Sequence, residues 1–286
     1  MNHAIVFQSD FGLCDGAVAA MHGVAFSEDS NLKIFDLTHE IPPYDIWEAS
    51  YRLIQTVEYW PEGTVFVSVV DPGVGSHRRS IAIKTKSNRY IITPDNGTIT
   101  HVKLMTGIEE VRLIQESSSH LPHSELSYTF HGRDVYAYVG ARLASSHITF
   151  EEIGDLVEVD SLELLPVIAP VLEEKEIEGT IDVLDVRFGS LWTNIPYDLF
   201  KSLGVQRGDK VEVTIQNDPR FVYQNIVTFA KSFADVHAGE SLVYINSLQN
   251  MAVAINQGSF ANAYNIGTGT SWKIKIKKAP RMIYEN

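Results

Sequence analysis

An aspartate and an arginine seven residues apart stand on a loop that could support acid–base chemistry. Residues Val67 to Val70 are apolar apart from one serine and predict a buried strand, which Asp71 follows directly. Gly73 and Gly75 allow backbone angles closed to other residues, so the loop can bring Arg78 back beside Asp71. Ligands collect at the C-terminal ends of strands in open α/β sheets. The pair therefore indicates either catalytic groups or an ion pair that only stabilises the loop.

The elements around this loop alternate between strand and helix. Strand patterns at Ala4–Gln8 and Lys33–Leu37 are each followed by a helical pattern, with Asp15 and Asp45 as candidate helix caps. Strands joined through single helices predict an α/β domain with a mostly parallel sheet flanked by helices.

The character of the chain changes after about residue 155. A segment with scattered carboxylates and two prolines leads into short β-like runs separated by turns. We therefore expect an N-terminal α/β domain over 1–160, a linker over 161–175, and a smaller C-terminal antiparallel β-barrel over 176–286.

Composition excludes several classes of protein. A net charge of −13 argues against nucleic acid as the main partner, and no apolar run approaches the length needed to span a membrane. The single cysteine, Cys14, excludes an intramolecular disulfide and a cysteine-based zinc site, and we expect it to pack in the fold. No secretory leader is visible at Met1–Gln8, so a cytoplasmic enzyme is expected, although many binding proteins share this composition.

Further short motifs occur in a specific order along the chain. They are Ser9-Asp10-Phe11-Gly12 with Asp15, Asp36-Leu-Thr-His39, Val70-Asp71-Pro72-Gly73-Val74-Gly75 with Arg78, Pro94-Asp95-Asn96-Gly97, Thr129-Phe130-His131-Gly132-Arg133-Asp134, Phe188-Gly189-Ser190-Leu191-Trp192-Thr193-Asn194, Phe233-Ala234-Asp235 and Tyr244-Ile245-Asn246-Ser247. In this order the chain resembles the S-adenosyl-L-methionine hydrolases, the adenosine-forming hydroxide adenosyltransferases related to fluorinase and chlorinase. The resemblance covers nearly the whole length.

The resemblance implies an activity and an assembly. The reaction is attack of water on the 5′ carbon of S-adenosylmethionine, which releases adenosine and L-methionine without a metal or another cofactor. The assembly is a homotrimer in which the substrate lies between the N-terminal domain of one subunit and the C-terminal domain of its neighbour.

The resemblance also implies roles for individual residues. Asp71, Arg78 and His131 would surround the attacking water, Asp10 would bind the ribose hydroxyls, and Phe188 and Phe233 would stack on adenine. Other implied substrate contacts are Asp15, Tyr44, Phe130, Asp185, Ser190, Asn246 and Ser247. From the residues alone, Asp10 has the alternative role of a loop cap, Asp15 that of a helix cap, and the two phenylalanines that of core aromatics.

The chain departs from the halogenating relatives at three positions. Ser190 stands where they carry an adenine-binding asparagine, Leu248 where they carry a carboxylate-binding arginine, and Tyr44 where they carry a pocket tryptophan. The presence of Asp71 beside Arg78 and His131 favours water over halide, because a carboxylate in the nucleophile pocket repels an anion.

Other functions remain open from the residues. One is a halide-dependent adenosyl transferase, and another is a protein that binds S-adenosylmethionine or adenosine without turnover. A third is a metal-dependent hydrolase, with ligands from Asp10, Asp36, His39, Asp71 and His131, although His39 could instead be a hydrogen-bonded structural residue. His120 and His123 fall in a polar loop and are expected to be solvated.

Overall fold

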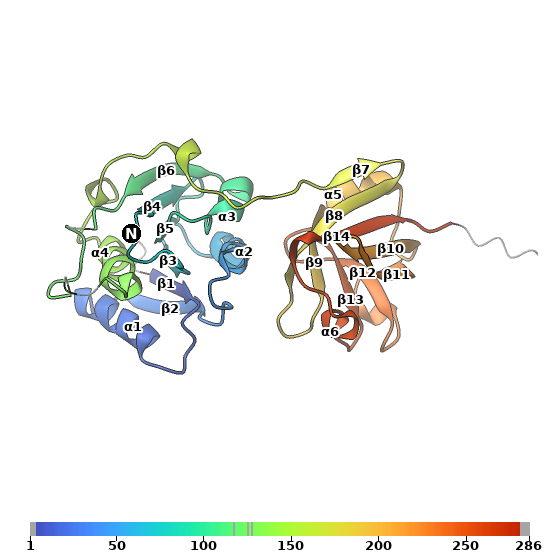
Figure 1. Cartoon of the computed structure of the whole chain (residues 1–286), viewed down its shortest axis with the longest axis horizontal. Coiled ribbons are helices and arrows are strands. Elements are labelled where there is room, and N and C mark those ends of the chain that lie inside the picture. Colours follow the sequence, from blue (N-terminus) through green and yellow to red (C-terminus); the bar gives the residue numbers. More distant parts are fainter. Residues whose placement is uncertain (1–3, 117, 125, 127, 281–286) are drawn as a thin grey trace, which may run out of the picture. The chain divides into compact units, whose positions relative to one another are not determined.

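The computed structural model describes residues 4–116, 118–124, 126 and 128–280. The chain divides into two compact units, Met1–Leu165 and Pro166–Asn286, which are coloured blue to green and yellow to red in Figure 1. Each unit has its own hydrophobic core.

The first unit is built on a six-stranded sheet. Its strands, in spatial order, are β2 (Lys33–Thr38), β1 (Ala4–Ser9), β3 (Val65–Val69), β5 (Tyr90–Pro94), β4 (Ser80–Thr85) and β6 (Ile108–Leu113). β1 pairs in parallel with β2 and β3, and β3 pairs in parallel with β5, whereas β4 runs antiparallel to both of its neighbours. The predicted α/β fold with a mostly parallel sheet is confirmed.

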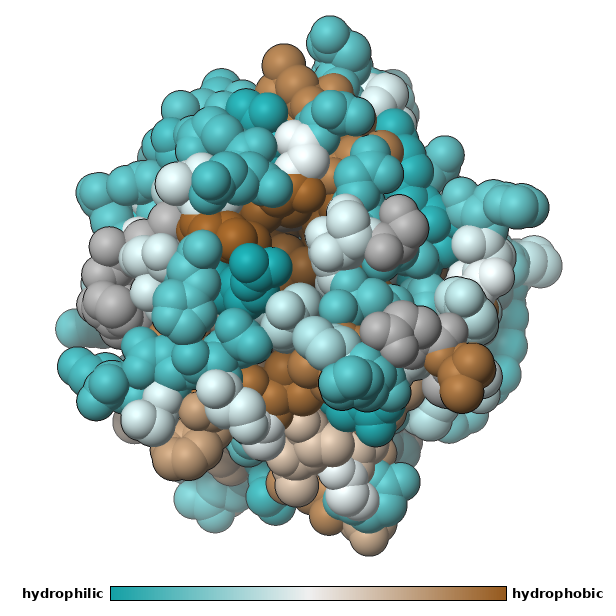
Figure 2. All heavy atoms as spheres, turned by 90° about the vertical axis from the view of Figure 1, so that its left-hand side faces the viewer, coloured by the Kyte–Doolittle hydropathy of each residue, from teal (hydrophilic) through white to brown (hydrophobic). Residues whose placement is uncertain are grey.

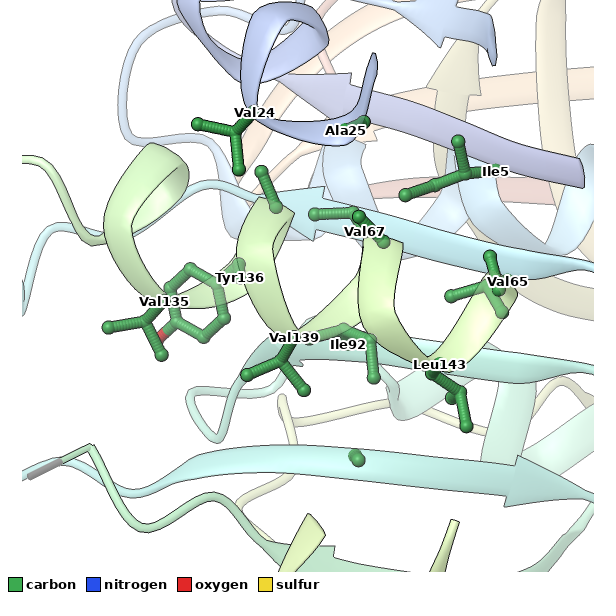
Figure 3. Packing of buried hydrophobic residues seen from close by; sticks show 14 of the residues in the cluster. Ile5, Val24, Ala25, Val65, Val67, Ile92, Val135, Tyr136, Val139 and Leu143 are labelled. Atoms are coloured by element: carbon green, nitrogen blue, oxygen red, sulfur yellow. The ribbon is translucent and has the colours of Figure 1, made fainter. Parts of the chain in front are cut away.

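Helices cover both faces of this sheet (Figure 1). Alternate residues of a strand point to opposite faces, so Val65 and Val67 of β3 enter one core cluster and Phe66 enters the other. The first cluster is closed by α1 (Ala17–Glu28) and α4 (Tyr138–Ala144), and Figure 3 shows its packing. The second is closed by α2 (Ile46–Thr56) and α3 (Thr100–Met105). Packing on both faces explains the continuous apolar character of these strands.

The second unit is a closed β-barrel. Its strands, in spatial order, are β14 (Gly269–Lys278), β10 (Lys210–Asn217), β11 (Arg220–Phe229), β12 (Ser241–Ile245), β13 (Asn250–Ile255), β9 (Leu191–Pro196) and β8 (Glu176–Leu184), and β14 pairs with β8 to close it. Strand β7 (Val171–Glu173) pairs antiparallel with the first residues of β8. The expected barrel is confirmed, with one difference: β11 and β12 pair in parallel.

The segment predicted as a linker, 161–175, is divided between the two units. Leu162 packs in the second core cluster of the α/β unit, and the backbone N–H of Leu165 donates to Thr100 Oγ1 at 2.9 Å. In the barrel unit, the carbonyl of Ile168 accepts a hydrogen bond from Asn194 Nδ2. The division after Leu165 therefore falls within a segment that is anchored on both sides.

Short helices complete both units. They are η1 (Val57–Tyr59), the π-helical turn η2 (Gly132–Ala137), η3 (Glu151–Ile153), η4 (Val159–Ser161), α5 (Tyr197–Phe200), η5 (Lys201–Leu203), η6 (Phe233–Asp235) and α6 (Phe260–Tyr264). The face shown in Figure 2 is mainly hydrophilic, with smaller hydrophobic areas between polar residues. Among the described residues, every helix is too short or too polar to cross a lipid bilayer.

Candidate active site

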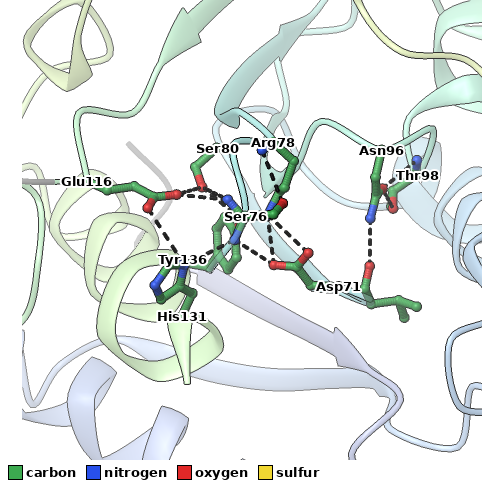
Figure 4. Close-up of polar contacts among 10 residues, drawn as sticks. Asp71, Ser76, Arg78, Ser80, Asn96, Thr98, Glu116, His131 and Tyr136 are labelled. Atoms are coloured by element: carbon green, nitrogen blue, oxygen red, sulfur yellow. Dashed lines mark hydrogen bonds and ion pairs between the residues drawn. The ribbon is translucent and has the colours of Figure 1, made fainter. Parts of the chain in front are cut away.

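Asp71 and Arg78 form a two-pronged ion pair just beyond the C-terminal end of β3 (Figure 4). Arg78 Nε lies 3.0 Å from both carboxylate oxygens of Asp71, and Nη2 lies 2.6 Å from Oδ2. Both side chains are largely buried, with 10% of Arg78 and 6% of Asp71 exposed. A planar guanidinium with a carboxylate in this geometry fixes the direction of both groups.

The third predicted catalytic residue, His131, lies against the same guanidinium. Arg78 Nη2 is 3.0 Å from His131 Nδ1, and because a guanidinium can only donate, Nδ1 must be the acceptor. The neutral ring therefore carries its proton on Nε2. Burial lowers the pKa of His131 below its ordinary value, and the positive charge of Arg78 lowers it further. The carboxylates of Glu116 and Asp71 raise this pKa but do not outweigh the other two effects.

A second carboxylate, Glu116, closes the other side of Arg78. Its Oε1 accepts from Arg78 Nη1 at 2.8 Å and from the hydroxyl of Ser80, and Oε2 lies 3.7 Å from His131 Nδ1. Burial tends to raise the pKa of Glu116, but the hydrogen bonds from Ser80 and Arg78 outweigh it and hold that pKa low. Sequence reasoning missed this residue, since a carboxylate 38 positions from Arg78 in a polar loop gives no local signal.

Local structure positions the trio in two ways. Asn96, in the turn after β5, donates from Nδ2 to the carbonyl of Val70 at 2.8 Å and so holds the residue before Asp71. On the other side, His131 immediately precedes the π-helical turn, and such turns often occur at functional sites. Gly132 leaves room there for the ring of Phe11, because a Cβ atom at this position would lie 3.0 Å from that ring and would require it to shift.

A cavity of about 270 Å³ lies beside the trio. It is lined by Asp10, Phe11, Pro43, Tyr44, Val69, Asp71, Val74, Thr129, Phe130, His131 and Gly132. Five of the predicted site residues, Asp10, Tyr44, Asp71, Phe130 and His131, thus share one cavity. Asp10 also accepts a hydrogen bond from the backbone N–H of Tyr44 at 2.8 Å, so its carboxylate is held by the neighbouring loop.

The barrel unit holds a second cavity, of about 660 Å³. It is lined by Asp185, Arg187, Phe188, Ser190, Phe233, Tyr244, Ile255, Gln257, Gly258 and Ser259, and it contains four more predicted site residues. Phe188 is 70% exposed and Phe233 is 39% exposed, so neither is a core aromatic. Asp185 Oδ1 lies 3.2 Å from the backbone N–H groups of Arg187 and Phe188, which shapes the loop that presents Phe188. Arg187 is a cationic side chain that sequence reasoning did not single out.

Three predicted substrate contacts do not line either cavity. Asp15 is exposed and accepts from the backbone N–H of Ala17 at 2.9 Å, at the start of α1, whose cap residue is Gly16. Asn246 is buried in the turn between β12 and β13, where Oδ1 accepts from the backbone of Leu248 and Asn250. Ser247 belongs to the same turn.

Two expectations about other residues are wrong. His120 is only partly exposed, its ring centroid lies 6.1 Å from that of His131, and its Nε2 is buried without a partner, so it is not a solvated loop histidine. Cys14 is exposed and does not pack.

The ligand set considered for the alternative, metal-dependent hydrolase is not brought together as one group. Among the described residues, the group with ligand-compatible spacing is His22, Asp36 and His39, and it includes neither Asp71 nor His131. His39 does have the structural role considered above, since its Nδ1 lies 2.7 Å from Ser9 Oγ and its Nε2 lies 3.0 Å from Asp36 Oδ1.

An α/β unit that presents a carboxylate–guanidinium–imidazole trio, followed by a barrel with an aromatic cavity, defines a class of two-domain enzymes. Family models assign the class: residues 5–154 match the SAM hydroxide adenosyltransferase N-terminal domain, and residues 179–273 match the corresponding C-terminal domain. The chain belongs to the SAM hydroxide adenosyltransferase family.

Individual relatives extend over most of the chain. It is 34% identical to an (R)-S-adenosyl-L-methionine hydrolase from Salinispora arenicola, over 94% of this chain and 97% of the relative. It is 28% identical to a fluorinase from Actinopolyspora mzabensis, over 94% of this chain and 96% of that relative. The crystal structure of an uncharacterized conserved protein from Thermotoga maritima superposes with a TM-score of 0.87 at 34% identity, covering 96% of this chain and 100% of that one.

Proposed function

We propose that this enzyme hydrolyses S-adenosyl-L-methionine to adenosine and L-methionine. The observation that carries the proposal is the Asp71–Arg78 ion pair with His131 hydrogen-bonded to Arg78, because Asp71 and His131 line the cavity that also holds Asp10. Relatives named (R)-S-adenosyl-L-methionine hydrolase at 32–39% identity support the choice of substrate.

The sulfonium of the substrate is already a good leaving group and needs no protonation. Water attacks the 5′ carbon, the C–S bond breaks, and its electron pair returns to the positively charged sulfur, which leaves as the neutral thioether of methionine. Free water is a weak nucleophile, so the enzyme must orient it, exclude competing solvent and accept its proton as the C–O bond forms.

Asp71 is the better proton acceptor of the two candidate bases. Nδ1 of His131 is occupied by an N–H of Arg78, and Nε2 of the neutral ring already carries a proton. A carboxylate has about four lone-pair sites, so Asp71 retains acceptor capacity beside the three short contacts from Arg78. Arg78 directs the carboxylate, and His131 serves as a neutral member that packs and orients the guanidinium.

The remaining predicted residues would bind the two ends of the substrate. Asp10 can accept hydrogen bonds from both ribose hydroxyls, and the exposed rings of Phe188 and Phe233 offer surfaces for adenine stacking. Asp185 and Arg187 line the barrel cavity with opposite charges, as a zwitterionic amino acid would require, and Arg187 could replace the arginine absent at Leu248. These groups are carried on two separate units. In line with the family resemblance, the proposal includes a homotrimer in which the α/β unit of one subunit meets the barrel of a neighbour.

The decisive experiment is incubation of the purified protein with S-adenosylmethionine in ¹⁸O-labelled water, followed by chromatography and mass spectrometry. We expect adenosine carrying one ¹⁸O at the 5′ oxygen and an equal amount of methionine, with the same rate after treatment with a chelator. A protein-free sample and heat-denatured protein correct for spontaneous breakdown of the substrate.

The other outcomes identify the alternatives. A 5′-halogenated nucleoside in chloride or fluoride buffer would identify a halide-dependent transferase, and activity lost with a chelator and restored by metal would identify a metal-dependent hydrolase. Substrate that is bound but recovered unchanged would identify a binding protein. A monomer with full activity in light scattering would contradict the proposed trimer.

A further inference from the structure

Two imidazoles and a carboxylate converge on one point away from the Asp71–Arg78 ion pair. His22 Nε2 lies 2.8 Å and His39 Nε2 lies 3.0 Å from the same oxygen, Oδ1 of Asp36. One candidate ligand atom from each of the three residues can be chosen so that all lie within 4.8 Å of one another. The His22 and His39 ring centroids are 6.4 Å apart, with the ring planes at 64°.

The fold holds each of these side chains in place. Asp36 is on the edge strand β2, His39 follows the end of that strand, and His22 projects from α1 onto the ring of Phe7, whose centroid is 5.4 Å away. The side chain of His39 is 1% exposed, and its Nδ1 is bonded to Ser9 Oγ at 2.7 Å. A partner of this kind on Nδ1 orients a metal-binding imidazole so that Nε2 faces the ion.

We propose that His22, Asp36 and His39 bind a divalent transition metal of the Zn²⁺, Co²⁺ and Ni²⁺ class. Two imidazoles with one carboxylate are typical ligands of such ions, and three protein ligands leave a coordination position for water. Metal–ligand bonds of about 2.0–2.1 Å place tetrahedral ligand atoms about 3.3 Å apart, so each contact to Asp36 needs to lengthen by only about 0.5 Å.

The site is accessible, and none of its three residues lines the cavity beside Asp71. About a third of the side chains of His22 and Asp36 is exposed, with values of 32% and 39%, so an ion can enter from solvent. Two contacts link the site to the loop that carries Asp10: Ser9 Oγ bonds to His39 Nδ1, and Gly12 N–H donates to the carbonyl of His39 at 2.8 Å.

The test is metal titration of chelator-treated, desalted protein, using CoCl₂ with visible absorption and ZnCl₂ with calorimetry at pH 7.5. We expect one ion per chain and the intense visible absorption of tetrahedral Co²⁺. The variants are His22→Gln, which keeps an N–H donor toward Asp36, and Asp36→Asn. Each should weaken binding at least tenfold while the unfolding temperature without metal stays close to that of the unmodified protein.

The matched control is His147→Ala, because His147 is an exposed histidine that also faces a carboxylate, with Nδ1 3.4 Å from Glu28 Oε2, but is not part of the His22–Asp36–His39 group. This variant should bind metal as the unmodified protein does. The proposal would be overturned if the unmodified protein bound the metal no more tightly than the His22→Gln and Asp36→Asn variants do. The same holds for an ion that persists in both variants, since its ligands would then lie elsewhere.

Discussion

Replacing Asp71 by asparagine separates proton transfer from the electric field of the site. With His131 neutral, the cluster holds two negative charges, on Asp71 and Glu116, and one positive charge, on Arg78. Its net charge is therefore −1. Either Asp71→Asn or Glu116→Gln changes that charge to zero, but Asp71 lines the cavity and Glu116 is not among its lining residues.

The expected magnitudes differ accordingly. A positioned general base contributes about 10²–10⁴-fold to rate, so Asp71→Asn should lower kcat by that factor, which corresponds to about 3–5 kcal/mol of transition-state free energy. Glu116→Gln removes an equal charge behind Arg78 but leaves the proton acceptor in place, and it should lower kcat by less than about tenfold. Both amides keep an oxygen that can accept from Arg78.

The assay is steady-state release of adenosine, with kcat and KM determined for both variants and thermal unfolding measured to verify folding. Two results would refute the reasoning. If Asp71→Asn retains more than a tenth of kcat, Asp71 is not the proton acceptor. If both variants lose activity equally, the rate depends on the charge of the cluster and not on proton transfer to Asp71.

Further substitutions test the rest of the structure. Arg78→Lys should lower kcat at least tenfold, because an ammonium cannot reproduce the planar contacts to Asp71, Glu116 and His131; a rate near normal would contradict the positioning role. Phe188→Ala should raise KM about tenfold or more with kcat nearly unchanged, since stacking on a base contributes about 1–3 kcal/mol; an unchanged KM would remove Phe188 from the adenine site. Burial lowers the pKa of His101 to about 4, so its neutral form stabilises the fold above pH 6.5 and this stability is lost as the pH falls toward 4. From pH 7 to 5 the loss is about 2 kcal/mol in urea unfolding, and His101→Phe should show a correspondingly smaller loss.

The fold was predictable where burial imposes a pattern on the sequence. β1 and β3 are buried, mostly apolar runs bounded by turn residues, and the helices between successive strands dictate a parallel arrangement. Asp71 was predictable for the same reason, because the end of a buried strand fixes where the next polar side chain lies. The glycines after it made the return of Arg78 possible, and the structure contains that ion pair.

Contacts between distant polar loops left no such pattern. Glu116 reaches Arg78 from the loop after β6, and His22 is a half-buried residue of the mostly apolar helix α1. Each contact depends on how separate elements pack, and a single polar residue has no periodicity that reports its partner.

The charge of the cluster also bears on the choice of nucleophile. Two unit charges about 4 Å apart interact by about 4 kcal/mol at an effective dielectric constant of 20, which is close to a thousandfold in an equilibrium. An anion beside Asp71 meets two negative charges that Arg78 neutralises only in part, which leaves a net charge of −1, whereas water has no net charge and is not repelled. Similarity to relatives named fluorinase therefore does not decide the nucleophile of this enzyme, because that choice depends on the balance of charge around one guanidinium.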